Sequence, residues 1–472
     1  DFGKLAGDEK LRLVERVIQG RGFITIAESL NAVEAWLSSI PGNVYANVRQ
    51  PLISTLNLAH MMPVSAVWAG PARNDHLMGP PLVITRTDGA TPFRLVTHVG
   101  DVGHTLVAGP TGMGKSVLLA TLALQFRRYP DSRLFLFDMG RSLRATVLGM
   151  GGEHYDLGGD GDLAFQPLAR IDQTSYRSWA AEWLAARLLQ EGVVVGPEQK
   201  AALWTALESL AGAPEAQRTL TGLSVLLQDN VLRQALQPYV LGGAHGQLLD
   251  ADQDRLGTAD VQCFEMEELM HSKAAVAAVL SYLFARFEER FDGAPTLLIL
   301  DEAWLFLDDP LFAARIRQWL KTLRKKNVSV IFATQSLADI QNSSIAAAII
   351  ESCASRIFLP NPQASEPQIR GIYQGFGLND RQIEIIAQAT PKRDYYYQSR
   401  QGNRLFDLDL DLGPVTLAFT AAASPAEQRD ISQVLQRSDA AGFAPAWLRH
   451  RGLGWAADLL TSQTPQRKEH LP

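Results

Sequence analysis

The sequence GHTLVAGPTGMGKSVLLATLALQF, residues 103–126, decides the fold. The apolar run 104–108 predicts a short buried strand of a parallel sheet. The run 117–126 predicts a helix, because it contains strong helix formers and no helix breaker. Between these two runs lies the pattern G-x-x-x-x-G-K-[ST], formed by Gly109, Gly114, Lys115 and Ser116. The stretch therefore predicts a strand, a phosphate-binding loop and a helix in direct succession.

Each residue type in this loop has a chemical reason. Glycines let the backbone curl until successive N–H groups point inward at phosphate oxygens, and the following helix adds its positive N-terminal end. We expect Lys115 to lie against the β and γ phosphates of ATP and the Ser116 hydroxyl to ligate Mg²⁺. A chance match is the alternative, but the bare pattern is expected only about 0.02 times in a chain of this length. The expected nucleotide-binding residues are Gly109, Pro110, Thr111, Gly112, Met113, Gly114, Lys115, Ser116 and Val117.

A second landmark is the sequence APTLLILDEAWLFLDD, residues 294–309. The apolar run 297–300 predicts a buried strand that ends at Asp301 and Glu302. Two adjacent carboxylates in that position are costly unless a cation or a polar ligand uses them. In a phosphate-loop NTPase this is the Walker B position, where Asp301 holds Mg²⁺ through its water shell and Glu302 orients and deprotonates the attacking water. The alternative is a solvated acidic turn.

Three further polar residues are candidates for the same site. A strand predicted at 328–333 ends in Thr334 and Gln335, and an amide there is placed to sense the γ-phosphate and the attacking water. Arg324 near the preceding helix end is either a favourable helix C-terminal charge or a finger that reaches a neighbouring subunit's site. Spacing does not separate these two readings. Asp138, at the end of the strand predicted at 134–137, either contacts ligand water or a basic group or caps the next helix.

Composition limits the class of protein. A chain of 472 residues is expected to form two or three structural units. Its 44 basic and 50 acidic residues give a formal charge of −6, which argues against a basic nucleic-acid wrapper but leaves room for a local basic channel. Cys263 and Cys353 are expected to be reduced core residues of a cytosolic protein. No apolar run reaches the roughly 18 residues that span a bilayer, so we expect membrane association only through partners or an absent segment. The chain begins with Asp1, and we expect it to be a fragment of a longer protein.

The motif set GPTGMGKS, LFDMGRS, LLILDEAW, LRKKNVSVIFATQS and SRIFLPNP resembles the conjugative-transfer and type IV secretion ATPases of the TrbE kind. These belong to a larger group of hexameric pumps that includes HerA and FtsK. The resemblance covers roughly residues 95–420, and the leading segment resembles the junction between that family's N-terminal domain and its motor domain. It implies the C-terminal motor half of such a protein.

The resemblance implies a fold and a division of the chain. The expected fold is α/β: a RecA-like P-loop NTPase with a mostly parallel central sheet, an all-helical subdomain inserted after the second core strand, and closing strands that include the run from Tyr395 to the segment LGPVTLAFTAA. We expect a junction at 1–80, the leading portion of the ATPase core at 81–171, the helical insertion at 172–255, the remainder of the core at 256–423, and a helical tail at 424–472 whose last residues are disordered.

The resemblance also implies roles. Lys115 and Ser116 match the phosphate-loop pair, Asp301 and Glu302 the Walker B pair, and Gln335 the sensor glutamine. Arg324 matches the position of a trans-acting arginine, while Arg356 falls in a further family motif, with salt bridging at the core edge as the competing account.

The implied function is Mg²⁺-dependent ATP hydrolysis that energises a conjugative type IV secretion system. The implied assembly is a homo-hexamer that associates with inner-membrane components of that apparatus, in the cytoplasm and peripheral to the bacterial inner membrane, with DNA contact as an option. Two alternatives stay open: a DNA-translocating motor of the HerA or FtsK class, and a non-enzymatic scaffold that binds nucleotide as a structural ligand.

Overall fold

The computed structural model describes residues 2–43, 45–46, 54–62, 67–89, 91–158, 163–303, 310–408, 413–438 and 442–463. The chain divides into two compact units, Asp1–Val67 and Trp68–Pro472. The described residues of the first unit include the helices α1 (Phe2–Gln19), α2 (Ala32–Ser38) and α3 (Thr55–Met61). The expected first boundary was at residue 80, but Trp68 already packs in the second unit, since its ring lies 5.4 Å from Phe93 and 6.0 Å from Tyr397.

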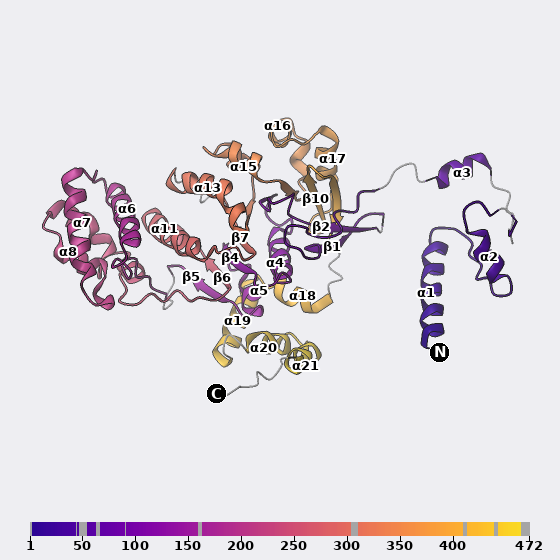
Figure 1. Cartoon of the computed structure of the whole chain (residues 1–472), viewed down its shortest axis with the longest axis horizontal. Helices are drawn as coiled ribbons and strands as arrows, with labels where there is room; N and C mark the ends of the chain where they lie inside the picture. The colour runs from indigo at the N-terminus through magenta and orange to yellow at the C-terminus, as the bar shows by residue number, and fades with distance from the viewer. Residues whose placement is uncertain are drawn as a thin grey trace. The chain divides into compact units, whose positions relative to one another are not determined.

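The second unit is built on one sheet (Figure 1). Its order is β2-β1-β11-β10-β9-β3-β8-β7-β4-β6-β5. The strands from β9 to β5 pair in parallel, and β10, β11, β1 and β2 add an antiparallel extension, so the expected mostly parallel α/β sheet is confirmed. The strands are β1 (Val83–Arg86), β2 (Pro92–Leu95), β3 (Thr105–Ala108), β4 (Arg133–Asp138), β5 (Glu153–Asp156), β6 (Val261–Glu265), β7 (Thr296–Leu300), β8 (Val328–Thr334), β9 (Ser355–Phe358), β10 (Asp394–Ser399) and β11 (Asn403–Asp407).

Helices cover both faces of this sheet because its central strands are apolar on both sides. On one face, α4 packs on alternate strand residues such as Val107 and Ile299. On the other face, α11 and α13 pack on the intervening residues, among them Leu106 and Leu298. The helices of the core are α4 (Lys115–Phe126), α5 (Arg144–Gly149), α11 (Lys273–Arg290), α13 (Pro310–Thr322), α14 (Leu337–Gln341), α15 (Ala346–Ser352), α16 (Pro367–Gly375) and α17 (Asp380–Gln388).

The helical insertion lies between β5 and β6. It contains α6 (Thr174–Gln190), α7 (Pro197–Ala211), α8 (Leu220–Leu226), α9 (Asn230–Leu236) and α10 (Gly246–Leu249). Figure 1 shows α6, α7 and α8 as a group on the β5 side of the sheet. The expectation that the insertion follows the second core strand is wrong, because β5 intervenes. This strand reads EHYD and is half-buried, so it lacks the apolar signal of a central strand.

The C-terminal region departs from the expected closing strands. β10 and β11 form a hairpin, but residues 413–420 are a helix, α18 (Gly413–Thr420), and not a strand. Pro414 is tolerated in the first turn of a helix, and Ala418 and Phe419 are buried with α5. The helices α19 (Pro425–Arg437), α20 (Phe443–His450) and α21 (Gly454–Gln463) follow. The expected disordered end, residues 464–472, lies outside the described residues.

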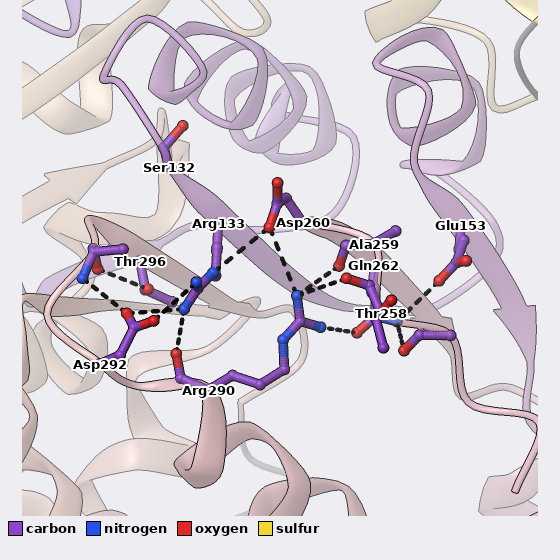
Figure 2. Close-up of polar contacts among 12 residues, drawn as sticks. Ser132, Arg133, Glu153, Thr258, Ala259, Asp260, Gln262, Arg290, Asp292 and Thr296 are labelled. Atoms are coloured by element: carbon purple, nitrogen blue, oxygen red, sulfur yellow. Dashed lines mark hydrogen bonds and ion pairs between the residues drawn. The ribbon is translucent and has the colours of Figure 1, made fainter. Parts of the chain in front are cut away.

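An arginine pair anchors the amino ends of β4, β6 and β7 (Figure 2). Arg133, the first residue of β4, makes two 2.9 Å hydrogen bonds to the carboxylate of Asp292. Arg290, the last residue of α11, donates to the side-chain oxygen of Gln262 at 2.9 Å and to the carbonyl oxygens of Thr258 and Ala259 at 3.1 and 2.9 Å. Its guanidinium also lies 4.9 Å from the Phe135 ring centroid. These contacts fix the C-terminal end of α11 against the amino-terminal ends of these strands.

No helix within the described ranges combines the length and the apolar character that crossing a membrane requires.

Replacing Arg290 tests this anchor. We expect Arg290→Ala to lower the free energy of unfolding by about 2 kcal/mol, since three acceptors at the sheet edge lose a charged donor. Arg381→Ala is the matched control, because Arg381 is an exposed arginine whose ion pair with Glu384 lies within one helix turn and contributes less than about 0.5 kcal/mol. Denaturant titration of both variants measures the difference, and equal losses would contradict the anchoring role.

Candidate functional site: a phosphate loop facing an acidic pair

The phosphate loop lies between β3 and α4, as the sequence predicts. Gly109 begins it where the strand ends, and its N–H donates to the Thr334 carbonyl at 3.1 Å. A Cβ on Gly109 would stand 2.4 Å from the Cβ of Leu359 at the end of β9, so no larger residue fits there. Gly114, with φ of +99°, turns the chain into α4 through a conformation that glycine adopts at little cost. Local geometry thus requires the glycines that the motif contains.

The acidic pair follows β7, two strands away from β3. All of Thr296–Leu300 is buried, and the Asp301 N–H donates to the Phe137 carbonyl at 3.0 Å, which ties the strand end to β4. Asp301 and Glu302 are 4% and 6% exposed. Glu302 has a φ of +54°, a left-handed conformation that costs of order 1 kcal/mol for a residue with a Cβ. The pair is therefore buried and held in place, and the reading as a solvated acidic turn is wrong.

Side chains connect the loop directly to the acidic pair. Lys115 Nζ lies 3.0 Å from Asp301 Oδ1 and also donates to Glu302 Oε1. The amide nitrogen of Gln335 donates to the same Glu302 oxygen at 2.9 Å, and the Thr111 hydroxyl donates to the amide oxygen of Gln335. One network therefore joins the phosphate loop, the end of β7 and the end of β8.

A cavity of about 940 Å³ opens at this network. The phosphate loop forms one wall, and the acidic pair and Gln335 form another. The other lining residues are Ser336 and Asp339 after β8, Met139 from the loop after β4, Lys392 from the loop before β10, and Leu417 and Ala421 at the end of α18. The volume lies at the upper end of the range found for small-molecule and cofactor sites.

Burial raises the pKa of the Asp301 carboxyl above its ordinary value of 3.8, although the neighbouring Lys115 acts in the opposite direction. Lys115 carries one positive charge against two carboxylates, so the ionised cluster keeps an excess negative charge in a buried place. Such an arrangement favours the arrival of a cation.

The chemistry of these groups fits Mg²⁺. Ser116 and Asp301 line the same cavity and offer a hydroxyl and a carboxylate oxygen. Within the described ranges, no three His, Cys, Asp or Glu side chains gather at one point in a way that would hold a metal. Mg²⁺ needs no such group, because it keeps several waters and takes further oxygens from phosphates.

Asp138 and Glu265 hold a neighbouring loop and do not face the cavity network as ligands. The Asp138 carboxylate accepts from the N–H groups of Met139 and Leu143 at 2.9 and 2.6 Å. Glu265, at the end of β6, accepts from the N–H groups of Gly140 and Arg141 at 3.0 and 2.5 Å. Burial raises the pKa of both carboxyl groups, and each lies close enough to another carboxylate to raise it further. The two carboxylates therefore fix the backbone of residues 139–143. Asp138 does not cap α5, because the N-cap residue of that helix is Leu143 and no side chain caps it; Asp138 bonds to the loop before the helix.

Arg324 and Arg356 lie away from this cavity. Arg324 sits in a short 3₁₀ turn before β8, 3.8 Å from Asp101, and with Arg356 it lines a second cavity of about 680 Å³. The seven residues of β8 put roughly 20 Å between Arg324 and Gln335. Arg356 donates to the Phe376 and Ile350 carbonyls, a backbone-holding arrangement and not an ion pair. Neither arginine reaches the chain's own phosphate loop.

Sequence reasoning missed Glu265 beside the site and three residues that line the cavity. Glu265 is the last residue of β6, as Asp138 is of β4. This shared position at the carboxyl end of a buried strand could have indicated Glu265 from the sequence. Lys392, Leu417 and Ala421 carry no motif, and only the fold brings them to a loop about 280 to 310 positions earlier in the chain. The expected roles of the catalytic residues stay predictions.

The phosphate loop follows β3, and the acidic pair follows β7, which lies two strands away from β3 in the same parallel sheet. This arrangement defines a P-loop NTPase fold. Residues 227–401 match the family model described as TraG P-loop domain, a range that contains Asp301, Glu302 and Gln335. The chain is 44% identical over 468 residues to a probable conjugal transfer protein TrbE of Sinorhizobium fredii and 45% identical over 462 residues to conjugal transfer protein TrbE of Rhizobium radiobacter. The chain belongs to the TrbE family of conjugal transfer proteins.

The alignments cover 97% and 96% of this chain but 70% and 56% of those two relatives, so the chain spans little more than half the length of the second one. The structure of VirB4 of Thermoanaerobacter pseudethanolicus superposes with a TM-score of 0.57 at 18% identity, covering 76% of this chain and all of that one. That likeness confirms the expected fold.

Acid should weaken binding of Mg²⁺·ADP. The raised pKa of Asp301 means that its carboxylate takes up a proton at a higher pH than an ordinary aspartate does, and the protonated form no longer serves the cation. We expect affinity to fall as pH is lowered from 7 towards 4. In Asp301→Asn we expect weaker binding at pH 7, because the carboxylate is gone. We also expect the affinity to depend less on pH, because only the titration of the nucleotide remains. Calorimetric titration at a series of pH values measures both, and parallel pH profiles for the two proteins would contradict the assignment.

Proposed function

We propose that this chain is the ATP-hydrolysing motor of a conjugative type IV secretion system. One observation carries the proposal: Lys115 of the phosphate loop contacts Asp301 and Glu302 within a cavity that also receives Gln335. Phosphoryl transfer to water requires an ammonium group for the phosphates, a carboxylate ligand for the metal, and a general base with an amide that orients the water. The two TrbE relatives are named as conjugal transfer proteins, which supports the biological context.

In the proposed reaction, the N–H groups of residues 112–117 bind the β-phosphate oxygens and Lys115 moves from Glu302 to the γ-phosphate. Release of Glu302 frees its carboxylate to accept a proton from the attacking water, and the Gln335 amide orients that water in line with the bond between the γ-phosphorus and the β-γ bridging oxygen. The water oxygen bonds to the γ-phosphorus as that bond breaks, so the products are ADP and inorganic phosphate. Mg²⁺, held by Ser116 and Asp301, would neutralise charge that develops on the phosphate oxygens. The residues act by position and charge, and no covalent intermediate forms on the protein.

We propose that Arg324 acts in trans within a homo-hexamer. Its distance from the chain's own phosphate loop supports this reading over action in cis. Its ion pair with Asp101 is long and both side chains are about half exposed, so the pair contributes little stability. An arginine that reaches a neighbour's γ-phosphate stabilises the negative charge of the transition state.

The proposed setting is the cytoplasmic side of the bacterial inner membrane, through contacts with inner-membrane components of the secretion apparatus. A scaffold that only binds nucleotide would have no use for the Glu302 and Gln335 pair beside the phosphate loop. The network of these two residues supports an enzyme over such a scaffold.

Two substitutions separate binding from hydrolysis. We expect Glu302→Gln to bind Mg²⁺·ATP but to hydrolyse it at least about 100-fold more slowly, because the general base is gone. We expect Lys115→Ala to lose both binding and hydrolysis. Lys325→Ala, an exposed basic residue outside the cavity, is the control and should keep the parent's turnover. Phosphate release and nucleotide titration on folded protein give both quantities, and normal turnover in Glu302→Gln or Lys115→Ala would defeat the proposed function.

Turnover measured against protein concentration tests the role of Arg324. We expect specific activity of the parent to rise with concentration as subunits assemble, and Arg324→Ala to lose about 10³-fold in turnover at saturating concentration while it still binds nucleotide. The same series with added DNA distinguishes a secretion ATPase from a DNA translocase, which requires salt-sensitive stimulation by DNA. Activity independent of both concentration and Arg324 would leave this arginine as a helix-end charge.

A further inference from the structure

The loop before β10 is fastened to the outside of the phosphate loop. The backbone N–H of Lys392 donates to the Met113 carbonyl at 3.2 Å, and the hydroxyl of Tyr395 donates to the Gly114 carbonyl at 3.2 Å. When the N–H groups of a phosphate loop point inward at an anion, the carbonyl groups must point outward and find donors elsewhere. Lys392 and Tyr395 supply those donors. The segment 392–395 therefore belongs to the construction of the nucleotide site.

The conformation of Lys392 is unusual and locally fixed. Its φ of +63° lies in the left-handed region, which a lysine enters only when the surroundings impose it. The Thr390 N–H donates to the Asp394 carboxylate at 2.7 Å, and the Asp394 N–H donates back to the Thr390 carbonyl at 3.0 Å. This closed turn holds Lys392 at its tip, beside Gly114, and the residue lines the nucleotide cavity.

The cavity is lined by a second basic side chain, Lys392, in addition to Lys115. Of the described residues that line it, Asp301, Glu302 and Asp339 are acidic, and Lys115 and Lys392 are basic. Lys115 is already engaged by two carboxylates. Lys392 has no ion pair within the described stretches of the chain, whereas the next residue, Arg393, is paired with Asp407 at 2.8 Å. A nucleotide diphosphate or triphosphate adds several negative charges to this place, and a mobile ammonium group is a common phosphate ligand.

We propose that Lys392 is a phosphate-binding residue: its ammonium group contacts the phosphate chain of the bound nucleoside diphosphate or triphosphate, opposite Lys115. The proposal rests on the proposed nucleotide site and adds to it a residue outside the phosphate-loop and Walker B motifs. Lys392 has two functions in this account. Its backbone holds the phosphate loop open for the anion, and its side chain binds the anion.

Lys392→Gly tests the side chain without disturbing the loop. Glycine adopts the left-handed conformation freely and keeps the N–H that bonds to Met113, so the variant should fold and melt no lower than the parent. We expect it to bind Mg²⁺·ADP about tenfold more weakly at low salt, the loss of one charge-assisted contact. The difference should shrink as ionic strength rises. Lys392→Arg keeps the charge and should recover most of the affinity.

Arg393→Ala is the matched control, because Arg393 is the adjacent basic residue, is 58% exposed and has its own carboxylate partner. It should bind Mg²⁺·ADP as the parent does. Parent affinity in Lys392→Gly at low salt, or an equal loss in Arg393→Ala, would overturn the proposal. Lys115→Ala separates this failure from failure of the proposed function: if the parent binds, Lys115→Ala does not and Lys392→Gly binds normally, the nucleotide site stands and only Lys392 is misassigned. A parent that does not bind Mg²⁺·ADP would overturn both.

Discussion

The contact of one buried ammonium group with two buried carboxylates organises this molecule. Lys115 is 8% exposed and its partners Asp301 and Glu302 are less exposed still, at 4% and 6%, so none of the three charges is solvated well by water. Breaking such a cluster leaves uncompensated charge in a poorly solvated place, which costs several kcal/mol. β3 and β7 are separated only by β8, so their ends lie roughly 10 Å apart, a gap that these long side chains cross. The same contact occupies the ammonium group of Lys115, so bound phosphates must displace Lys115 from Glu302.

The rest of the fold positions the loops at the carboxyl ends of the parallel strands. Asp138 and Glu265 use buried carboxylates to fix the backbone of residues 139–143, and that loop carries Met139 to the cavity. The hairpin of β10 and β11 brings Lys392 and Tyr395 against the phosphate loop from the other side. At the opposite edge, the contacts of Arg133 and Arg290 hold the amino ends of the strands. The site is thus assembled from segments spread over some 300 residues, each held by its own polar contacts.

The sequence predicted the elements whose signal is local. Runs of apolar residues marked β3, β7 and β8, and the fixed spacing around Lys115 marked the loop, because a phosphate nest demands those residue types within one short segment. Prediction failed where long-range packing decides. β5 reads EHYD and becomes a strand by pairing with β6, and residues 413–420 form a helix because Phe419 packs on α5. Lys392 carries no motif, and no local pattern shows that its loop meets residues near 113.

The most direct test of the central claim is a crystal structure with Mg²⁺ and a non-hydrolysable ATP analogue. The account predicts the triphosphate in the cavity between the phosphate loop and the pair Asp301 and Glu302, with Lys115 Nζ moved from Glu302 onto phosphate oxygens and the metal beside Ser116 and Asp301. A nucleotide bound elsewhere, or one bound there with the contact of Lys115 and Glu302 intact, would contradict it.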